Sequence, residues 1–205
     1  KYWYNQGYRV LDFIDDNFIF NKQRILDICN QINEANLVGL KLTCGNGIRA
    51  DKVDREVLNA MKEVGFSGLS IGVEVGNNRM LKLIKKGETI EQIENAIKLS
   101  TEMGFDVTLF FIVGLPGETE KDVQDSIKLA LKYPVNNANF YNAVPFPGTE
   151  LYDYIKKNKL FVVKDPDYLN TMAHFDDPIF ITPQLSLKQK KKMLALTRKI
   201  EKEIV

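Results

Sequence analysis

TLFFIVGLPGET, residues 108–119, joins an apolar run to a turn that contains two glycines and a proline. The run from 107 to 113 is rich in branched and aromatic side chains, which is typical of a parallel strand covered on both faces. The residues after the turn predict a helix with Thr119 as N-cap and Asp122 in a variant of the capping box. One apolar stripe of this helix comprises Val123, Ile127, Ala130 and Leu131. The stretch therefore predicts a strand, a tight loop and a helix.

The same pair of a strand and a helix recurs along the chain. Four more apolar runs, near residues 9–18, 38–51, 68–78 and 137–149, each lead into a helical pattern. Five strands about 30 to 40 residues apart are typical of right-handed parallel crossovers. They are too few for a closed eight-stranded barrel of ~250 residues. We therefore predict an α/β fold in which residues 1–150 form a partial TIM-like (β/α) barrel.

Residues 151–205 are predicted to form a C-terminal extension. After an irregular region, an amphipathic helix over 187–205 is expected to begin at Ser186 as its cap. Its inward side chains are expected to be Leu187, Leu194, Ile200 and Ile204. The lysine run comprises Lys190, Lys191 and Lys192. We expect this run to be a solvated helix face, with a partner surface as the alternative.

Composition excludes several classes of protein. The formal charge of +1 gives no broad attraction for nucleic acid or for an anionic membrane. No apolar stretch approaches the ~20 residues of a spanning helix, and no signal-peptide pattern is present. Cys29 and Cys44 do not suggest a disulfide framework, and we expect both to be buried core residues, with a ligand role for Cys44 as the alternative. These features favour a cytoplasmic protein without a membrane or nucleic-acid partner.

The first ten residues, KYWYNQGYRV, resemble the last turn of a helix that stops at Gly7 and runs into a strand. We therefore expect the chain to be cut from a longer protein whose first barrel strand lies upstream of Lys1. In that case the strand near residues 9–13 is an exposed edge of the sheet. The four aromatic residues here are Tyr2, Trp3, Tyr4 and Tyr8, which we expect to pack together rather than to form a binding platform.

Polar residues and glycines gather after each predicted strand. They are Asp15, Asp16 and Asn17; Thr43, Asn46 and Arg49; Glu74, Asn77 and Asn78; Gly114 and Gly117; and Asn142. In a barrel or an open parallel sheet, the carboxyl ends of the strands carry the chemistry. We therefore expect the functional site at this end of the sheet.

Individual residues at this end differ in what they predict. Glu74 indicates a functional site, because a charged side chain in an apolar strand is costly unless it is paired or wetted. Asp15 and Asp16 have two interpretations: they belong to the site, or one of them only caps a turn at Asn17. Arg49 fits either a carboxylate or phosphate ligand, or an ordinary ion pair to Asp51 or Glu74. His174, the only histidine, has no second histidine to form a metal or acid–base set.

The glycine turn has two interpretations. Gly114 leaves the backbone open to another molecule, and the N–H groups of the following helix favour an anionic group or a polar edge. A plain tight connection is the alternative. Glu118 and Asp122 lie in the first helical turn, where an acid gains ~0.3–1 kcal/mol from the helix dipole, so we expect both to be structural.

Five strings in this order resemble the radical S-adenosylmethionine (radical SAM) superfamily, in the branch whose full-length members often carry a cobalamin-binding domain. They are DFIDDNF (12–18), GIRAD (47–51), GVEVGNNRMLKLIKKG (72–87), FIVGLPGET (111–119) and NAVPFPGTELYD (142–153). The resemblance covers roughly residues 1–183. It implies a partial six-stranded barrel, with about five of the six strands present here. It also implies an iron–sulfur enzyme in which a 4Fe-4S cluster on a Cys-x-x-x-Cys-x-x-Cys loop cleaves S-adenosylmethionine to a 5′-deoxyadenosyl radical that removes hydrogen from a substrate.

The resemblance implies cofactor-binding roles at matching positions. Ile112 and Gly114 match the family's Gly-x-Ile-x-Gly-x-x-Gly-Glu strand, which lines the adenine, although Phe110 replaces the first glycine. Glu74 matches the polar position near the ribose or the methionyl group. Asp15, Asp16 and Asn17 stand where many members have Gly-Gly-Glu, which contacts the methionine amino group. Val144 and Pro145 match the last strand, whose backbone reads the adenine edge. Arg49 could meet the cofactor carboxylate.

The cysteine loop of the family is absent from this chain. Cys29 and Cys44 belong to no triplet, so we expect the metal ligands upstream of Lys1 and no cluster or radical activity in this piece. Loading of about four irons in an anaerobic reconstitution would contradict this expectation. The resemblance further implies an electron donor such as flavodoxin or ferredoxin. The catalytic residues, the substrate, cobalamin dependence and the oligomeric state stay open.

Two other functions fit the residues. One is an iron-free barrel enzyme that binds a phosphorylated metabolite at the glycine turn. The other is a non-catalytic relative that keeps the scaffold as an interaction module.

Overall fold

The structure is a computed structural model of the 205-residue chain. It describes all residues except 165, 167, 169–176 and 205, so His174 lies outside the described residues. The chain divides into two compact units. Unit 1 comprises residues 1–73, 88–110 and 132–138, and unit 2 comprises residues 74–87, 111–131 and 139–205.

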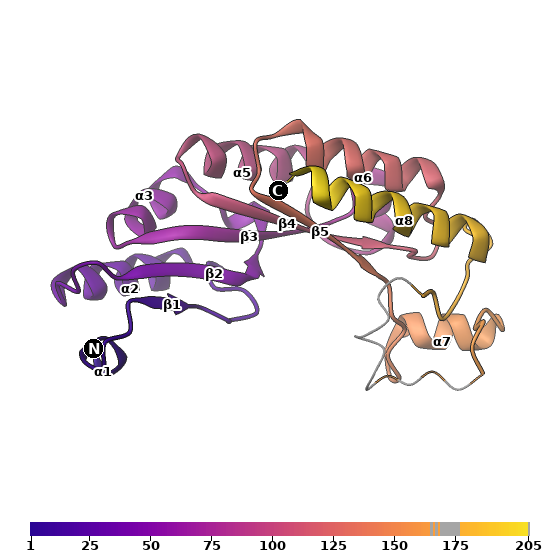
Figure 1. The fold of residues 1–205 in the computed structure, drawn as a ribbon, viewed down its shortest axis with the longest axis horizontal. Helices are drawn as coiled ribbons and strands as arrows, with labels where there is room; N and C mark the ends of the chain where they lie inside the picture. Colours follow the sequence, from indigo (N-terminus) through magenta and orange to yellow (C-terminus); the bar gives the residue numbers. More distant parts are fainter. Residues whose placement is uncertain (165, 167, 169–176, 205) are drawn as a thin grey trace. The chain divides into compact units, whose positions relative to one another are not determined.

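Five strands form one sheet in the order β1-β2-β3-β4-β5, which is also their order along the chain (Figure 1). They are β1 (Val10–Asp12), β2 (Lys41–Ile48), β3 (Phe66–Glu74), β4 (Asp106–Val113) and β5 (Asn137–Asn142). The strands are parallel, and β1 pairs with β2 from Val10 opposite Lys41 to Asp12 opposite Thr43. Parallel strands in chain order with helical connections confirm the predicted α/β fold, a partial TIM-like barrel.

Helices precede, connect and follow the strands. They are α1 (Tyr2–Asn5), α2 (Lys22–Glu34), the 3₁₀ helix η1 (Ala50–Lys52), α3 (Arg55–Glu63), α4 (Asn78–Leu83), α5 (Ile90–Glu102), α6 (Glu120–Lys132), α7 (Glu150–Lys157) and α8 (Leu187–Ile204). Both predicted caps are confirmed: the Thr119 and Ser186 hydroxyls accept from the N–H groups of Asp122 and Gln189. Neither α8 nor any other described helix is long and apolar enough to cross a bilayer.

Side chains alternate along the strands between a buried face and a more open face. On β4, Val107, Leu109 and Phe111 are fully buried, whereas the residues between them are half-buried. The more exposed set is Thr43, Gly45 and Gly47 on β2, Gly68, Gly72 and Glu74 on β3, Thr108, Phe110 and Ile112 on β4, and Asn139 and Tyr141 on β5. The prediction that β4 is covered on both faces is therefore wrong for one face. This face carries glycines and polar side chains together with the larger Phe110, Ile112 and Tyr141.

The expectation of an exposed first edge is confirmed. β1 has one neighbour in the sheet, and the Val10 side chain is 63% exposed. The aromatic cluster before it also packs as expected. The centre of the Trp3 ring lies 5.0 Å from that of Tyr2 and 5.4 Å from that of Tyr8, both in edge-on contacts.

The other edge strand, β5, is covered by α8. Glu201 accepts a hydrogen bond from the Phe140 N–H at 2.6 Å, and Arg198 donates one to the Phe140 carbonyl at 2.9 Å. Arg198 and Glu201 also pair with each other at 2.7 Å. An ion pair on α8 thus satisfies backbone groups of an edge strand that would otherwise be open to pairing with another chain.

Three details of the helix faces differ from the sequence prediction. Leu131 is 51% exposed, because the buried stripe of α6 continues through Leu129 and Ala130 instead. Leu187 is exposed because it begins the first turn of α8, before the helix reaches its packing face. Lys190, predicted to be solvated with its two neighbours, is completely buried. Its position bears directly on the glycine turn.

Candidate functional site

The turn after β4 needs glycine at two positions. Gly114 has φ +94° and Gly117 has φ +79°, both in the left-handed region that other residues adopt only at a cost. The turn belongs to unit 2 and leads directly into α6. The sequence prediction of a strand, a tight loop and a helix is confirmed here.

The space beside Gly114 is filled by the protein itself. A Cβ atom built on Gly114 would lie 2.0 Å from Cε and 2.5 Å from Nζ of Lys190. The Lys190 side chain comes from α8, 76 residues further along the chain. We expected open space beside the α-carbon of Gly114. This expectation is wrong on the side where Lys190 lies.

Glu118 occupies the N–H groups of the turn. Its side chain is fully buried, and its Oε2 accepts hydrogen bonds from the N–H groups of Gly114 and Leu115. The next N–H group, that of Thr119, donates to Asp122 at 2.8 Å. Two carboxylates thus hold the N–H groups that we expected to attract an anionic ligand. The expectation that Glu118 and Asp122 are structural agrees with these contacts.

Burial shifts the pKa values of both charged groups beside the turn toward neutrality. It raises the pKa of Glu118 from 4.5 to about 7, although the hydrogen bonds from Gly114 and Leu115 oppose the change. It lowers the pKa of Lys190 from 10.5 to about 7, opposed by the charge of Glu118. Both groups therefore titrate near neutral pH.

These shifts predict a pH dependence of stability. Because the folded state raises the pKa of Glu118, the stabilising contribution of its protonation is lost as the pH rises from 4.5 to about 7. Because the folded state lowers the pKa of Lys190, the contribution of its deprotonation is lost as the pH falls from 10.5 to about 7. The contribution of the pair to the free energy of unfolding should therefore be lowest near pH 7.

The measurement compares urea unfolding of the wild type and the E118Q/K190M variant at pH 5 to 9. The difference between their unfolding free energies should dip by about 2 kcal/mol from pH 5 to pH 7 and recover by pH 9, given ~1.4 kcal/mol per pH unit for each group. Parallel profiles for the two proteins would contradict the assignment.

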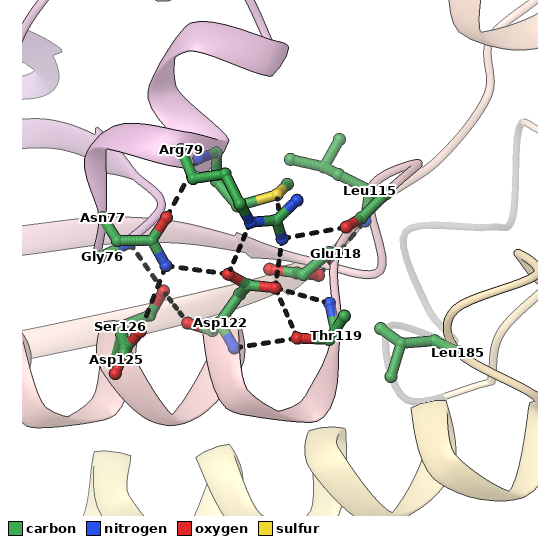
Figure 2. A network of polar contacts seen from close by, with 12 residues as sticks. Gly76, Asn77, Arg79, Leu115, Glu118, Thr119, Asp122, Asp125, Ser126 and Leu185 are labelled. Atoms are coloured by element: carbon green, nitrogen blue, oxygen red, sulfur yellow. Dashed lines mark hydrogen bonds and ion pairs between the residues drawn. The ribbon is translucent and has the colours of Figure 1, made fainter.

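A polar network joins the other end of the turn to α4 (Figure 2). Arg79 forms a very short ion pair with Asp122 and donates to the Gly117 carbonyl at 3.0 Å. Asn77 caps α4 and donates to Asp122 at 2.9 Å. Burial alone would raise the pKa of Asp122, but the hydrogen bonds from Thr119, Arg79 and Asn77 lower it to about 2. The network therefore keeps a charged carboxylate and fixes the turn against α4.

Three strand ends of unit 2 bring the predicted residues together. Glu74 ends β3 with φ +65° and forms an ion pair with Lys86 at 3.0 Å, so it is paired rather than left alone. The Ala143 N–H donates to the Val113 carbonyl at 2.9 Å, which places the segment after β5 beside the end of β4. The five residues predicted in this unit are Glu74, Ile112 and Val144, all half-buried, and Gly114 and Pro145, both buried.

The remaining predicted residues lie in unit 1. Asp15 pairs with Arg24 at 2.9 Å, whereas Asp16 is exposed. Asn17 is half-buried, and its Oδ1 has no hydrogen-bond partner among the described residues. Arg49 pairs with Asp51 at 2.9 Å, which is one of the two ion pairs that the sequence left open.

The described residues of the chain do not fit an iron–sulfur cluster. They contain no group of three or more His, Cys, Asp or Glu side chains that could hold a metal ion. Cys29 and Cys44 are both buried core residues, as predicted. Burial raises the pKa of the Cys29 thiol to about 11 and that of Cys44 further, whereas a cluster needs thiolates.

An adenosyl sulfonium cofactor fits the strand ends of unit 2 better. The half-buried Glu74 carboxylate favours a cation nearby, and the half-buried Ile112 offers apolar surface for a base.

Two residues that contact the glycine turn were not recognised from the sequence. Lys190 stands in a run of three lysines, which gives no signal of burial. Arg79 follows the asparagine cap of α4 and looks like an ordinary surface residue, and its side chain is indeed 54% exposed. The sequence does place Glu118 four residues after Gly114, a spacing that lets a side chain reach back to the turn.

Comparison with known proteins identifies the family. The profile of the Radical SAM superfamily matches residues 11–130. An uncharacterized methyltransferase of Pyrococcus horikoshii is 32% identical over 93% of this chain and 40% of its own length. A putative methylthiotransferase of Methanocaldococcus jannaschii is 29% identical over 72% of this chain and 34% of its own length. The chain thus spans less than half of these curated relatives.

Solved structures share the fold. The radical S-adenosylmethionine methyltransferase TsrM from Kitasatospora setae, solved with cobalamin and a [4Fe-4S] cluster, matches with a TM-score of 0.67 at 20% identity, over 80% of this chain and 33% of that protein. Coproporphyrinogen III oxidase (HemN) from Escherichia coli, described as a radical SAM enzyme, matches with a TM-score of 0.67 at 19% identity, over 96% of this chain and 40% of that one. Because the family profile covers more than half of the chain and the fold agrees, this protein belongs to the Radical SAM superfamily.

Proposed function

We propose that this chain holds S-adenosylmethionine in an enzyme that uses it for radical chemistry on a substrate of unknown structure. The observation that carries the proposal is the meeting of Glu74, Gly114 and Val144 at neighbouring strand ends in unit 2. When bound and cleaved by an electron from a 4Fe-4S cluster, S-adenosylmethionine supplies a 5′-deoxyadenosyl radical that abstracts hydrogen. The cluster ligands belong to a part of the enzyme outside the described residues, so we propose that this chain alone is inactive.

The residues of unit 2 have distinct roles in this proposal. Glu74 supplies negative charge near the cationic end of the cofactor. Lys86 holds the Glu74 carboxylate in place. Ile112 and Gly114 line the adenine, and the backbone at Val144 and Pro145 binds its polar edge. Asp15, Asp16, Asn17 and Arg49 remain predicted contacts for the methionyl amino and carboxyl groups.

The relatives favour one reaction class. Two of them are named as a methyltransferase and a methylthiotransferase, and TsrM was solved with cobalamin. We therefore propose methyl transfer, with cobalamin as a further cofactor of the whole enzyme, as the first reaction to test. An electron donor such as flavodoxin or ferredoxin and a cytoplasmic location belong to the same proposal.

The structure weakens the phosphate-binding alternative. A phosphate at the glycine turn would need the N–H groups of Gly114 and Leu115, which already donate to Glu118. It would also meet the negative charge of Asp122, whose pKa of about 2 keeps it ionised.

The test of the proposal is binding of S-adenosylmethionine to the full chain, measured by calorimetry with wild type, E74Q and E150Q. Removing the half-buried Glu74 charge leaves Lys86 without this carboxylate near the cation, so E74Q should weaken binding about 10-fold, or ~1.4 kcal/mol. Glu150 is 86% exposed and pairs with Lys85 in the same unit, so E150Q should bind as the wild type does. An unaffected E74Q variant, or a wild type that does not bind S-adenosylmethionine, would contradict the proposal.

A further inference from the structure

Lys190 differs in burial from its two neighbours in the lysine run of α8. It is 0% exposed, although lysine is almost never fully buried without a partner. It belongs to α8, beyond residues 11–130 to which the family profile corresponds. A charged residue buried at this cost needs an explanation from its contacts.

The contacts of the Lys190 ammonium group converge on the glycine turn and the segment before α8. Its Nζ lies 3.5 Å from the Gly114 carbonyl and 3.4 Å from the Phe180 carbonyl. It also lies 3.5 Å from the centre of the Phe180 ring, a favourable position for a cation. Lys190 thus bridges Gly114 and Phe180 from a single helix position.

Glu118 holds the same glycine from the other side. It accepts from the Gly114 N–H, while Lys190 reaches the Gly114 carbonyl. Glu118 and Lys190 thus contact the N–H and the carbonyl of Gly114, whose φ of +94° only glycine adopts readily. Each is fully buried, so removing either leaves the other charge uncompensated.

The rest of α8 is anchored so that Lys190 stays in place. Lys192 pairs with Glu120 at the start of α6 at 2.8 Å, and Arg198 with Glu201 binds the edge of β5. Figure 1 shows α8 running beside α6. The position of the ammonium group is therefore determined by the packing of a whole helix rather than by one flexible side chain.

We propose that Lys190 is a positioning residue that holds the Gly114 turn, together with Glu118, in the conformation that presents the end of β4 to the cofactor. The contacts of Lys190 and Glu118 with the turn are observed in the structure. The effect of Lys190 on cofactor binding rests on the proposed function above. The C-terminal helix thereby becomes part of the cofactor site, although none of its residues need touch the cofactor.

The test uses the full chain as wild type, K190M and K191M. Methionine keeps most of the length of the lysine side chain without its charge, and Lys191 is the adjacent residue, 54% exposed in an ion pair with Asp177. One readout is the position of the Gly114 and Leu115 amide signals in ¹⁵N-labelled protein; the other is the dissociation constant of S-adenosylmethionine. K190M should shift both amide signals and weaken binding about 10-fold, while K191M should change binding less than about twofold.

The outcomes separate the two proposals. If K190M keeps wild-type amide signals, Lys190 does not position the turn and the inference is overturned. If the signals shift but affinity is unchanged, Lys190 positions the turn and only its effect on the cofactor is overturned. If the wild type does not bind S-adenosylmethionine, the proposed function fails, and the amide signals alone decide whether Lys190 holds the turn.

A titration of the wild type covers the case in which K190M does not fold. The charged groups around the turn are Glu118, Lys190, Asp122 on α6 and Arg79 on α4, and the last two pair with each other. Asp122 has a pKa of about 2, so it does not titrate between pH 5 and 9. The Gly114 and Leu115 amide signals should therefore move together with a midpoint near pH 7, and signals that do not move would overturn the inference.

Discussion

Gly114→Ala is expected to lower the free energy of unfolding by about 4 kcal/mol, measured by urea denaturation at a fixed pH. One part is the left-handed backbone, since φ is +94° and a β-carbon there costs roughly 1–2 kcal/mol. The other part is the contact with Lys190, because the new methyl group would lie 2.0 Å from its Cε. Overpacking of this kind typically costs ~1–3 kcal/mol.

Two comparisons separate these parts. Gly148 has φ +85°, and a Cβ atom added there would meet nothing within 4 Å, so Gly148→Ala should cost only the roughly 1–2 kcal/mol of backbone strain. In an E118Q/K190A background the obstructing side chain is gone, and Gly114→Ala should cost about as much as Gly148→Ala. A Gly114→Ala penalty of the same size in both backgrounds would show that Lys190 does not fill this space.

The elements of the fold could be predicted because their signals are local. The caps at Thr119 and Ser186 depend on residues three positions apart, and β4 is one nearly contiguous apolar run, although its half-buried face was not predicted. The identity of the family came from five short strings, and the profile match agrees with it. Such patterns are readable because each is completed within one strand, one turn or one helix.

The contacts that shape the glycine turn depend on residues far apart in the sequence. Lys190 meets Gly114 across 76 positions, and Arg79 meets Asp122 across 43. The burial of Lys190, unlike that of Lys191 beside it, depends on where α8 packs and not on its own neighbours. Single-sequence patterns describe a helix face by its hydrophobicity, so a lysine that points inward is assigned to the solvent.

Gly76→Ala is expected to lower the free energy of unfolding by about 3 kcal/mol or more, the upper end for overpacking. A Cβ atom on Gly76 would lie 2.3 Å from the backbone nitrogen and 2.4 Å from the Cα of Ser126. Carbon atoms in contact normally stay ~3.5–4.0 Å apart, and helix backbone cannot rotate away as a side chain can. The loop after β3 must therefore move away from α6.

That movement should also disrupt the polar network beside the turn. Gly76 donates to the Ser126 hydroxyl at 2.8 Å, and the next residue, Asn77, donates to Asp122 at 2.9 Å. Ser126→Ala removes the first of these bonds without inserting any atom, so it should cost only ~1–3 kcal/mol. Calorimetric or urea unfolding of the two variants distinguishes the causes: a Gly76→Ala loss no greater than that of Ser126→Ala would mean that the loop can yield, and that close backbone packing does not fix the end of β3 against α6.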